Sequence, residues 1–169
     1  MSKTFSILTL MSALALSACA TTPDANKTAA TTATNLACKP TTEQEIAALF
    51  DRWNSSLQTG DPKKVVANYH DNSILLPTVS NTPRLSDAEK EDYFHHFLQD
   101  QPKGKIDMRH IQIGCNTALD AGLYTFTMGK TGKEVKARYS YTYRWDGKEW
   151  LITSHHSSAM PEKAAASHH

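Results

Sequence analysis

The chain has 169 residues, and its 18 lysine and arginine residues against 17 aspartate and glutamate residues give a formal net charge of +1. This near balance gives no indication of nucleic-acid binding or of an acidic partner. The length is sufficient for one domain with a single hydrophobic core.

The N-terminal residues are typical of an exported protein. Lys3 precedes an apolar stretch over residues 5–16 that is too short to span a bilayer, and the stretch ends in Leu-Ser-Ala-Cys. This pattern predicts a signal peptide at residues 1–18. It resembles the bacterial lipoprotein signal, in which the cysteine, here Cys19, is lipidated; an ordinary cleaved signal is the alternative. Ala20 follows, without an aspartate to favour the inner membrane. We therefore expect a periplasmic protein held at the outer membrane by its lipid only.

The composition divides the remaining chain into three parts. Residues 19–40 are rich in threonine and alanine and predict a flexible tether, residues 41–162 predict a single domain, and residues 163–169 predict a disordered tail. Apart from Cys19, the chain has Cys38 and Cys115. In an oxidising periplasm the two can pair, so we favour a disulfide over two free thiols.

The first half of the domain predicts helices. Thr42 to Glu45 matches a capping box, and apolar side chains then recur on one helical face. These are Ile46, Leu49, Phe50, Trp53 and Leu57. Asp61 and Pro62 predict the start of a second helix. Residues 73–76 predict a short strand that Pro77 ends.

A second capping box, Ser86 to Glu89, predicts a helix that carries aromatic side chains, among them Tyr93. The second half then predicts strands at residues 105–115, 118–128, 134–145 and 150–158. The first of these strands contains an irregularity near Arg109 and His110 that suggests a bulge, and Asp146-Gly147 predicts a hairpin. Helices followed by a meander indicate an α+β fold with helices packed on one face of an antiparallel sheet.

The last predicted strand carries the most informative motif, residues 155–161 (His-His-Ser-Ser-Ala-Met-Pro). Alternate side chains of a strand point to opposite faces. Regular alternation places His156 and Ser158 on the face of Ile152, and His155 and Ser157 on the other face. A face that begins apolar and ends in serine and histidine predicts the wall of a pocket where a proton could be transferred.

The order of elements over residues 42–160 resembles the nuclear transport factor 2-like (SnoaL-like) superfamily. The resemblance implies a curved sheet wrapped on the first helix to form a cone with an open mouth. Within this superfamily, Asp146-Gly147-Lys148-Glu149-Trp150 and the following strand resemble the association domain of calcium/calmodulin-dependent kinase. The sequence has no kinase domain, so this likeness implies fold and not function.

The C-terminal motif, together with Leu76-Pro77-Thr78 and residues 92–97 (Asp-Tyr-Phe-His-His-Phe), resembles the iota class of carbonic anhydrases. This resemblance implies reversible hydration of carbon dioxide to bicarbonate. It also implies a catalytic set of Thr78, Tyr93, His156 and Ser158. Simple packing is the alternative for Tyr93, a turn for Thr78, and an interior or interface position for His156.

Two further residues were candidates for substrate binding. Arg138 and Ser140 alternate on one strand and could reach the cavity, with a surface position as the alternative for Arg138. Tyr139, Tyr141 and Tyr143 form a stripe that predicts core or a subunit interface.

The residues favour a site without metal. A catalytic zinc requires three converging protein ligands, whereas His155 and His156 point to opposite strand faces and His95 and His96 diverge by about 100° on a helix. Zinc held by histidines that converge through the fold remains the alternative. Without metal, an imidazole could accept or orient the proton and hydroxyl groups could stabilise the oxyanion.

We expect carbon dioxide and bicarbonate as substrates, and a homodimer because the superfamily pairs its sheets face to face. Two other functions stay open. One is a non-catalytic ligand-binding or association module of the same fold. The other is an isomerase or cyclase, which requires an acidic residue inside the cone; Asp107 and Glu134 lie near strand starts, and we expect no inward-facing acid on the later strands.

Overall fold

The computed structural model describes residues 37–161, in which helices precede a five-stranded sheet. The helices are α1 (Glu43–Leu57), α2 (Pro62–Val66), α3 (Asp87–Phe97) and the short 3-10 helix η1 (Leu98–Asp100). The strands are β1 (Tyr69–Leu76), β2 (Pro102–Ile113), β3 (Thr117–Met128), β4 (Glu134–Trp145) and β5 (Trp150–Ala159). The predicted signal peptide, Cys19, most of the predicted tether, the last residue of the predicted domain and the predicted tail at residues 163–169 lie outside the described residues.

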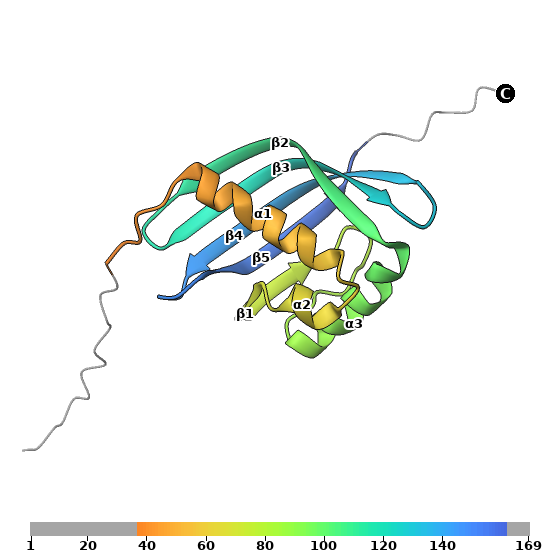
Figure 1. Cartoon of the computed structure of the whole chain (residues 1–169), viewed down its shortest axis with the longest axis horizontal. Helices are drawn as coiled ribbons and strands as arrows, with labels where there is room; N and C mark the ends of the chain where they lie inside the picture. Colours follow the sequence, from red (N-terminus) through yellow and green to blue (C-terminus); the bar gives the residue numbers. More distant parts are fainter. Residues whose placement is uncertain (1–36, 162–169) are drawn as a thin grey trace, which may run out of the picture. The chain divides into compact units, whose positions relative to one another are not determined.

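The predicted α+β class is confirmed, with one difference in the sheet. The strand order is β1-β5-β4-β3-β2, and the pairs from β2 to β5 are antiparallel. However, β1 pairs with β5 in parallel, so the sheet is mixed and not purely antiparallel. The two segments lie far apart in the sequence, and no hairpin connects them. The last strand therefore occupies an inner position in the sheet, between β1 and β4 (Figure 1).

Helix α1 lies across one face of the curved sheet, and α2 and α3 lie beside β1 (Figure 1). The apolar face predicted for α1 is buried in full: Ile46, Leu49, Phe50, Trp53 and Leu57. Each buried side chain of this size stabilises the fold by about 1.5–3 kcal/mol. The sheet supplies the opposing surface from alternating positions of β3 and β4, which include Tyr139, Tyr141 and Tyr143. The tyrosine stripe of β4 is thus core.

Caps fix where the helices begin. Ser86 and Glu89 form the complete capping box predicted for α3. At α1 only half of the predicted box forms: Thr42 accepts the backbone N–H of Glu45, but the Glu45 carboxylate binds Thr41 and Lys39 instead of returning to the cap. Asp61 caps α2 by accepting the backbone N–H of Lys63 at 3.0 Å.

The first described residues are attached to the far end of the β2–β3 hairpin. Cys38 and Cys115 form a disulfide, the pair that the sequence favours, across a sequence separation of 77. Beside it, the backbone N–H of Lys39 donates to the side-chain oxygen of Asn116 at 2.7 Å. The described part of the chain contains no helix long and apolar enough to cross a membrane.

Candidate active site

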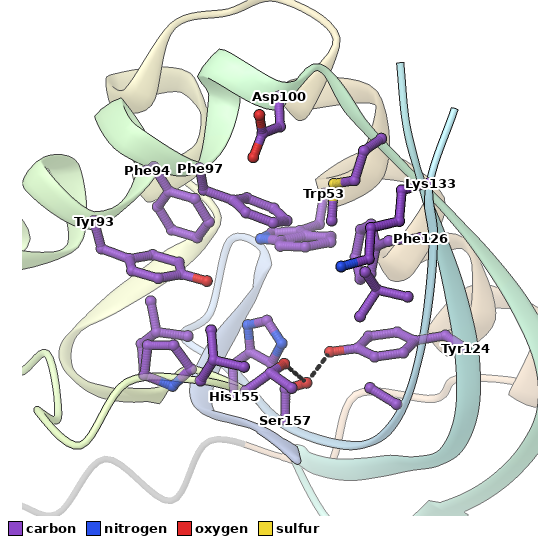
Figure 2. A pocket seen from close by; sticks show the side chains of 17 residues that line it. Trp53, Tyr93, Phe94, Phe97, Asp100, Tyr124, Phe126, Lys133, His155 and Ser157 are labelled. Carbon is purple, nitrogen blue, oxygen red and sulfur yellow. Dashed lines mark hydrogen bonds between the residues drawn. The ribbon is translucent and has the colours of Figure 1, made fainter. Parts of the chain in front are cut away.

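A cavity of about 340 Å³ lies between α3 and the inner face of the sheet (Figure 2). Its walls are mostly aromatic and aliphatic, and several of its neutral polar groups gather at the base. Helix α1 contributes Trp53, α3 contributes Tyr93, Phe94 and Phe97, β3 contributes Tyr124, Phe126 and Met128, and β5 contributes His155 and Ser157. Thr78 joins them from the turn after β1.

The structure reverses the predicted faces of β5. In the pairing with β4, Tyr143 is opposite Ile152 and Thr142 is opposite Ser154. Thr153 is therefore an extra residue that has no opposite residue in the register of the two strands. A bulge of this kind shifts the alternation of every later residue by one. His155 and Ser157 are consequently buried on the inner face together with Ile152.

The expected orientation of His156 and Ser158 is therefore wrong. His156 is exposed, and Ser158 is half-buried and accepts a hydrogen bond from Arg138 at 3.2 Å. The two proposed substrate-binding residues lie on the same outer face, since Ser140 pairs with His156 and Arg138 with Ser158. The structure thus brings four of the predicted residues together, but on the side of the sheet opposite the cavity.

Thr78 and Tyr93 do line the cavity, as the sequence predicts, although their chemical roles stay predictions. Thr78 Oγ1 forms a short hydrogen bond with Ser157 Oγ. Tyr93 packs against Phe94 and stacks on Phe97, and the Arg84 guanidinium lies over its ring with 5.9 Å to the centroid. Burial raises the pKa of Tyr93 to about 12, so this phenol stays neutral and can donate a hydrogen bond.

His155 is held in a dry and aromatic environment. Its ring stacks on Tyr141 with 4.2 Å between centroids and meets Trp53 edge-on at 5.3 Å. Burial lowers the pKa of His155 to about 3, because the charged imidazolium would lose its hydration, and the neighbouring His156 adds a smaller contribution. The imidazole is therefore neutral across the physiological range.

A chain of hydrogen bonds determines which nitrogen of His155 carries the proton. Trp53 Nε1–H donates to the phenol oxygen of Tyr69 at 3.2 Å, and that oxygen lies 2.8 Å from Nδ1 of His155. Because an indole N–H can only donate, the Tyr69 hydroxyl is free to direct its own proton to Nδ1. Nδ1 then accepts, and the proton of the neutral ring resides on Nε2.

Nε2 of His155 is buried and has no hydrogen-bond partner among the described residues. An unpartnered buried donor costs about 1–3 kcal/mol unless a ligand or water satisfies it. Figure 2 shows the His155 ring beside Ser157 at the base of the cavity. An oxygen atom of a bound molecule would satisfy Nε2 once a small movement of the neighbouring side chains opens it to the cavity.

A second group of donors lies beside this imidazole. Tyr124 Oη donates to Ser157 Oγ at 2.6 Å, and Ser157 Oγ in turn bonds Thr78 Oγ1 (Figure 2). Burial raises the pKa of the Tyr124 phenol, which keeps it protonated. Tyr124 donates to Ser157, and the bond between Ser157 and Thr78 can run in either direction, so one of these two hydroxyl protons is available to a ligand. The base of the cavity thus presents donors and suits a group that only accepts.

The residues that the structure describes contain no cluster of three or more His, Cys, Asp or Glu side chains arranged to hold a metal ion. At the base of the cavity, His155 is the single imidazole, and the hydroxyl groups around it are poor zinc ligands. The donor set therefore does not fit a catalytic zinc bound by three protein side chains.

The expectation that no acid faces inward is also wrong. Asp120 of β3 is fully buried on the inner face. Its Oδ1 accepts the Tyr139 hydroxyl at 2.8 Å and the N–H of Arg109 Nε at 3.2 Å. Burial raises the pKa of Asp120, and these two contacts oppose the shift. The carboxylate is used inside this cluster and does not line the cavity described above.

Sequence reasoning missed His155, Ser157, Tyr124 and Lys133 as cavity residues. The motif contains two His-x-Ser pairs, at 155/157 and 156/158, and the spacing alone cannot choose between them. Tyr124 lies an even number of residues from Asp120 and Phe126, so the three side chains share one strand face, and this alternation was the signal available in the sequence. Lys133 lies in a loop, where no periodicity assigns a direction.

Comparison with known proteins places this geometry in context. The model of the calcium/calmodulin dependent protein kinase II association domain matches residues 42–161. A solved protein of Xanthomonas campestris described as such an association domain is 48% identical, with a TM-score of 0.69, and the match covers 73% of this chain and 91% of that one. No curated protein matches the chain.

More distant structures show the same fold. A nuclear transport factor 2-like protein of Pseudomonas putida is 18% identical with a TM-score of 0.62, covering 71% of this chain and 87% of that one. An iota-carbonic anhydrase from a cyanobacterium, solved in complex with bicarbonate, is 21% identical with a TM-score of 0.65, covering 73% and 94%. At these identities the likeness establishes the predicted nuclear transport factor 2-like fold.

Proposed function

This chain belongs to the calcium/calmodulin dependent protein kinase II association domain family, and we propose its function from the cavity. The function is reversible hydration of carbon dioxide to bicarbonate. The observation that carries the proposal is the buried Nε2 of His155, which has no partner among the described residues and belongs to a ring beside a chain of hydroxyl groups at the base of a mostly apolar cavity (Figure 2). The neighbour that binds bicarbonate on the same fold supports this choice.

The reaction requires little from the protein beyond positioning and charge stabilisation. A water oxygen forms a bond to the carbon, one C=O electron pair moves onto its oxygen, and the water loses one proton, which leaves bicarbonate. Apolar walls such as Phe97 and Phe126 admit carbon dioxide, which is itself apolar. The oxygen atoms that gain charge need fixed hydrogen-bond donors.

Within this scheme His155 donates and does not act as the base. Its low pKa and its Nε2–H tautomer suit a hydrogen bond to a substrate oxygen. Thr78, at the end of the hydroxyl chain, donates to the second oxygen, and Tyr93 donates from the α3 wall. The proton of the attacking water passes through solvent at the mouth of the cavity to buffer.

The experiment compares matched variants in stopped-flow measurements of carbon dioxide hydration. His155→Ala should lower kcat by about 100-fold, the effect of removing one oxyanion donor. His156→Ala, the adjacent exposed histidine, should leave kcat unchanged. Removal of metal ions by exhaustive chelation should not change the kcat of either variant. Loss of activity in His156→Ala with full activity in His155→Ala would refute the assignment.

A non-catalytic module remains the second candidate, favoured by the 48% identical association-domain relative. It predicts no hydration activity but saturable binding of bicarbonate or a similar acceptor.

We also propose a homodimer formed through the outer face of the sheet, where Met108 is 52% exposed. Sedimentation of the wild type and of Met108→Asp tests this, since a charge in the interface should yield monomers. We further propose a periplasmic location with lipidation at Cys19, which mass spectrometry of the membrane-extracted protein tests.

A further inference from the structure

Two charged side chains line the mouth of the cavity. Asp100 comes from η1 and Lys133 from the loop between β3 and β4, and they are the described lining residues that carry a formal charge. All other polar groups on the described walls are neutral, because burial keeps His155 uncharged. Figure 2 shows Asp100 across the cavity from His155 and Ser157, and Lys133 on the wall beside Phe126.

The backbone holds these two residues in place. The N–H of Lys130 donates to the carbonyl oxygen of Asp100 at 3.2 Å, and the N–H of Gly129 donates to that of Gln101 at 3.0 Å. Within the loop, the carbonyl oxygen of Lys133 accepts the N–H of Met128 at 2.9 Å. The two sides of the mouth are thus joined by main-chain hydrogen bonds, so Asp100 and Lys133 keep a fixed relation to the cavity.

Neither side chain is neutralised by an ion pair within the described part of the chain. An uncompensated charge at the entrance of a low-dielectric cavity acts on charged ligands and leaves neutral ones unaffected. Carbon dioxide is neutral, whereas bicarbonate is an anion. The two species therefore meet the same mouth with different electrostatic energies.

We propose that Lys133 and Asp100 form a charge-selective mouth, in which Lys133 attracts and holds the bicarbonate anion and Asp100 limits how tightly it is held. The inference rests on the proposed function only in taking bicarbonate as the anion. Lys133 acts on the anion through its positive charge at the wall of the cavity, and Asp100 opposes it so that product can leave. Lys133 and Asp100 thus set the affinity of the cavity for bicarbonate without contacting the carbon atom that reacts.

Equilibrium binding tests this without relying on catalysis. Isothermal titration of bicarbonate into the full chain, in a chloride-free buffer at low ionic strength, gives Kd directly. Lys133→Ala should raise Kd about fivefold and Asp100→Asn should lower it by a similar factor, as expected for one charge near water. Lys130→Ala is the matched control, because this exposed lysine of the same loop does not line the cavity. Both effects should fade as salt shortens the screening length to about 10 Å and below.

Kinetics supply a second measurement. The equilibrium constant fixes the ratio of kcat/KM in the two directions. A change confined to bound bicarbonate leaves both values of kcat/KM unchanged and appears as parallel changes in kcat and KM for bicarbonate. Equal Kd values for wild type, Lys133→Ala and Asp100→Asn would overturn the inference, as would absence of bicarbonate binding to the wild type. Charge-dependent binding without hydration activity would uphold the mouth and refute the proposed reaction instead.

Discussion

The phenol oxygen of Tyr69 lies 2.8 Å from Nδ1 of His155, and this contact orients the imidazole from behind the cavity. Tyr69 is itself buried, and burial raises the pKa of its phenol, so its proton is retained. The hydroxyl can therefore act as a fixed donor. This residue contacts no substrate in our scheme and acts through His155.

Tyr69→Phe should accordingly alter the tautomer of His155. Without the phenol proton, Nδ1 loses its donor and the two neutral tautomers approach equal populations. Nitrogen-15 NMR of the histidine ring reports the tautomer directly, and kcat for hydration should fall by about tenfold. Tyr143→Phe, which removes a buried hydroxyl without a partner among the described residues, is the control and should change neither quantity. An unchanged His155 spectrum in Tyr69→Phe would contradict the proposed hydrogen-bond chain.

The depressed pKa of His155 predicts how stability depends on pH. The unfolded chain takes up a proton at this residue near the ordinary value of 6.5, whereas the folded protein does so only near 3. Below pH 6.5 the unfolded state therefore binds more protons, and the free energy of unfolding falls by up to about 1.4 kcal/mol per pH unit. The contribution is fully present above pH 6.5 and is lost progressively toward pH 3.

Denaturant titrations at several pH values measure this contribution as the difference between wild type and His155→Gln. The difference should shrink as the pH falls through that window, and the exposed neighbour His156→Gln should show no such trend. Because the folded protein does not protonate His155 near pH 6.5, this residue should add no step there to the pH dependence of kcat. The kcat profiles of wild type and His155→Gln should therefore have the same shape near pH 6.5. A stability difference that is independent of pH would show that His155 is not buried as a neutral group.

Asp120→Asn separates the buried cluster from the cavity. The substitution leaves the Arg109 guanidinium without its charge partner, and breaking a buried pair costs about 3–5 kcal/mol. Because Arg109 is partly exposed, we expect the lower end, about 3 kcal/mol, in urea unfolding. Hydration kcat/KM should stay within about twofold of wild type because Asp120 lies outside the cavity lining. A large loss of activity in a folded Asp120→Asn protein would instead favour acid-base chemistry of the isomerase type.

Removing the disulfide should destabilise the domain. The double variant Cys38→Ser/Cys115→Ser frees a loop whose ends are 77 residues apart, and loss of such a link costs about 2–4 kcal/mol, chiefly by enlarging the unfolded ensemble. Calorimetry should show a lower Tm for the variant. A reducing agent should lower the Tm of the wild type to that of the variant and leave the variant itself unchanged. Identical Tm values for oxidised wild type and variant would exclude a stabilising role.

The helices and most of the strands could be predicted because their signals are local. The apolar spacing of α1 and the Ser86 cap of α3 each specify an element within a few residues. The pairing of β1 with β5 could not be predicted in this way, because no turn links the two strands. Its parallel direction depends on packing across the whole domain.

The candidate site was predicted in composition but not in orientation. After Ile152 the last strand contains Thr, Ser and His, and a run of polar residues has no hydrophobic alternation to indicate which face is buried. The bulge at Thr153 then decides the outcome. It is stabilised by contacts of Thr153 with Thr142 on β4, which are long-range interactions that local patterns do not reveal. A shift of one residue therefore exchanged His156 for His155.

The inner position of β5 has a consequence for biosynthesis. The first strand to emerge during translation finds its neighbour only when the final strand has been made, so β1 has no sheet partner on a nascent chain that stops before residue 150. Both His155 and Ser157 belong to that last segment. A ribosome must therefore translate past residue 157 before this cavity can form, and termination upstream of β5 yields a polypeptide that lacks both the sheet closure and the side chains of His155 and Ser157.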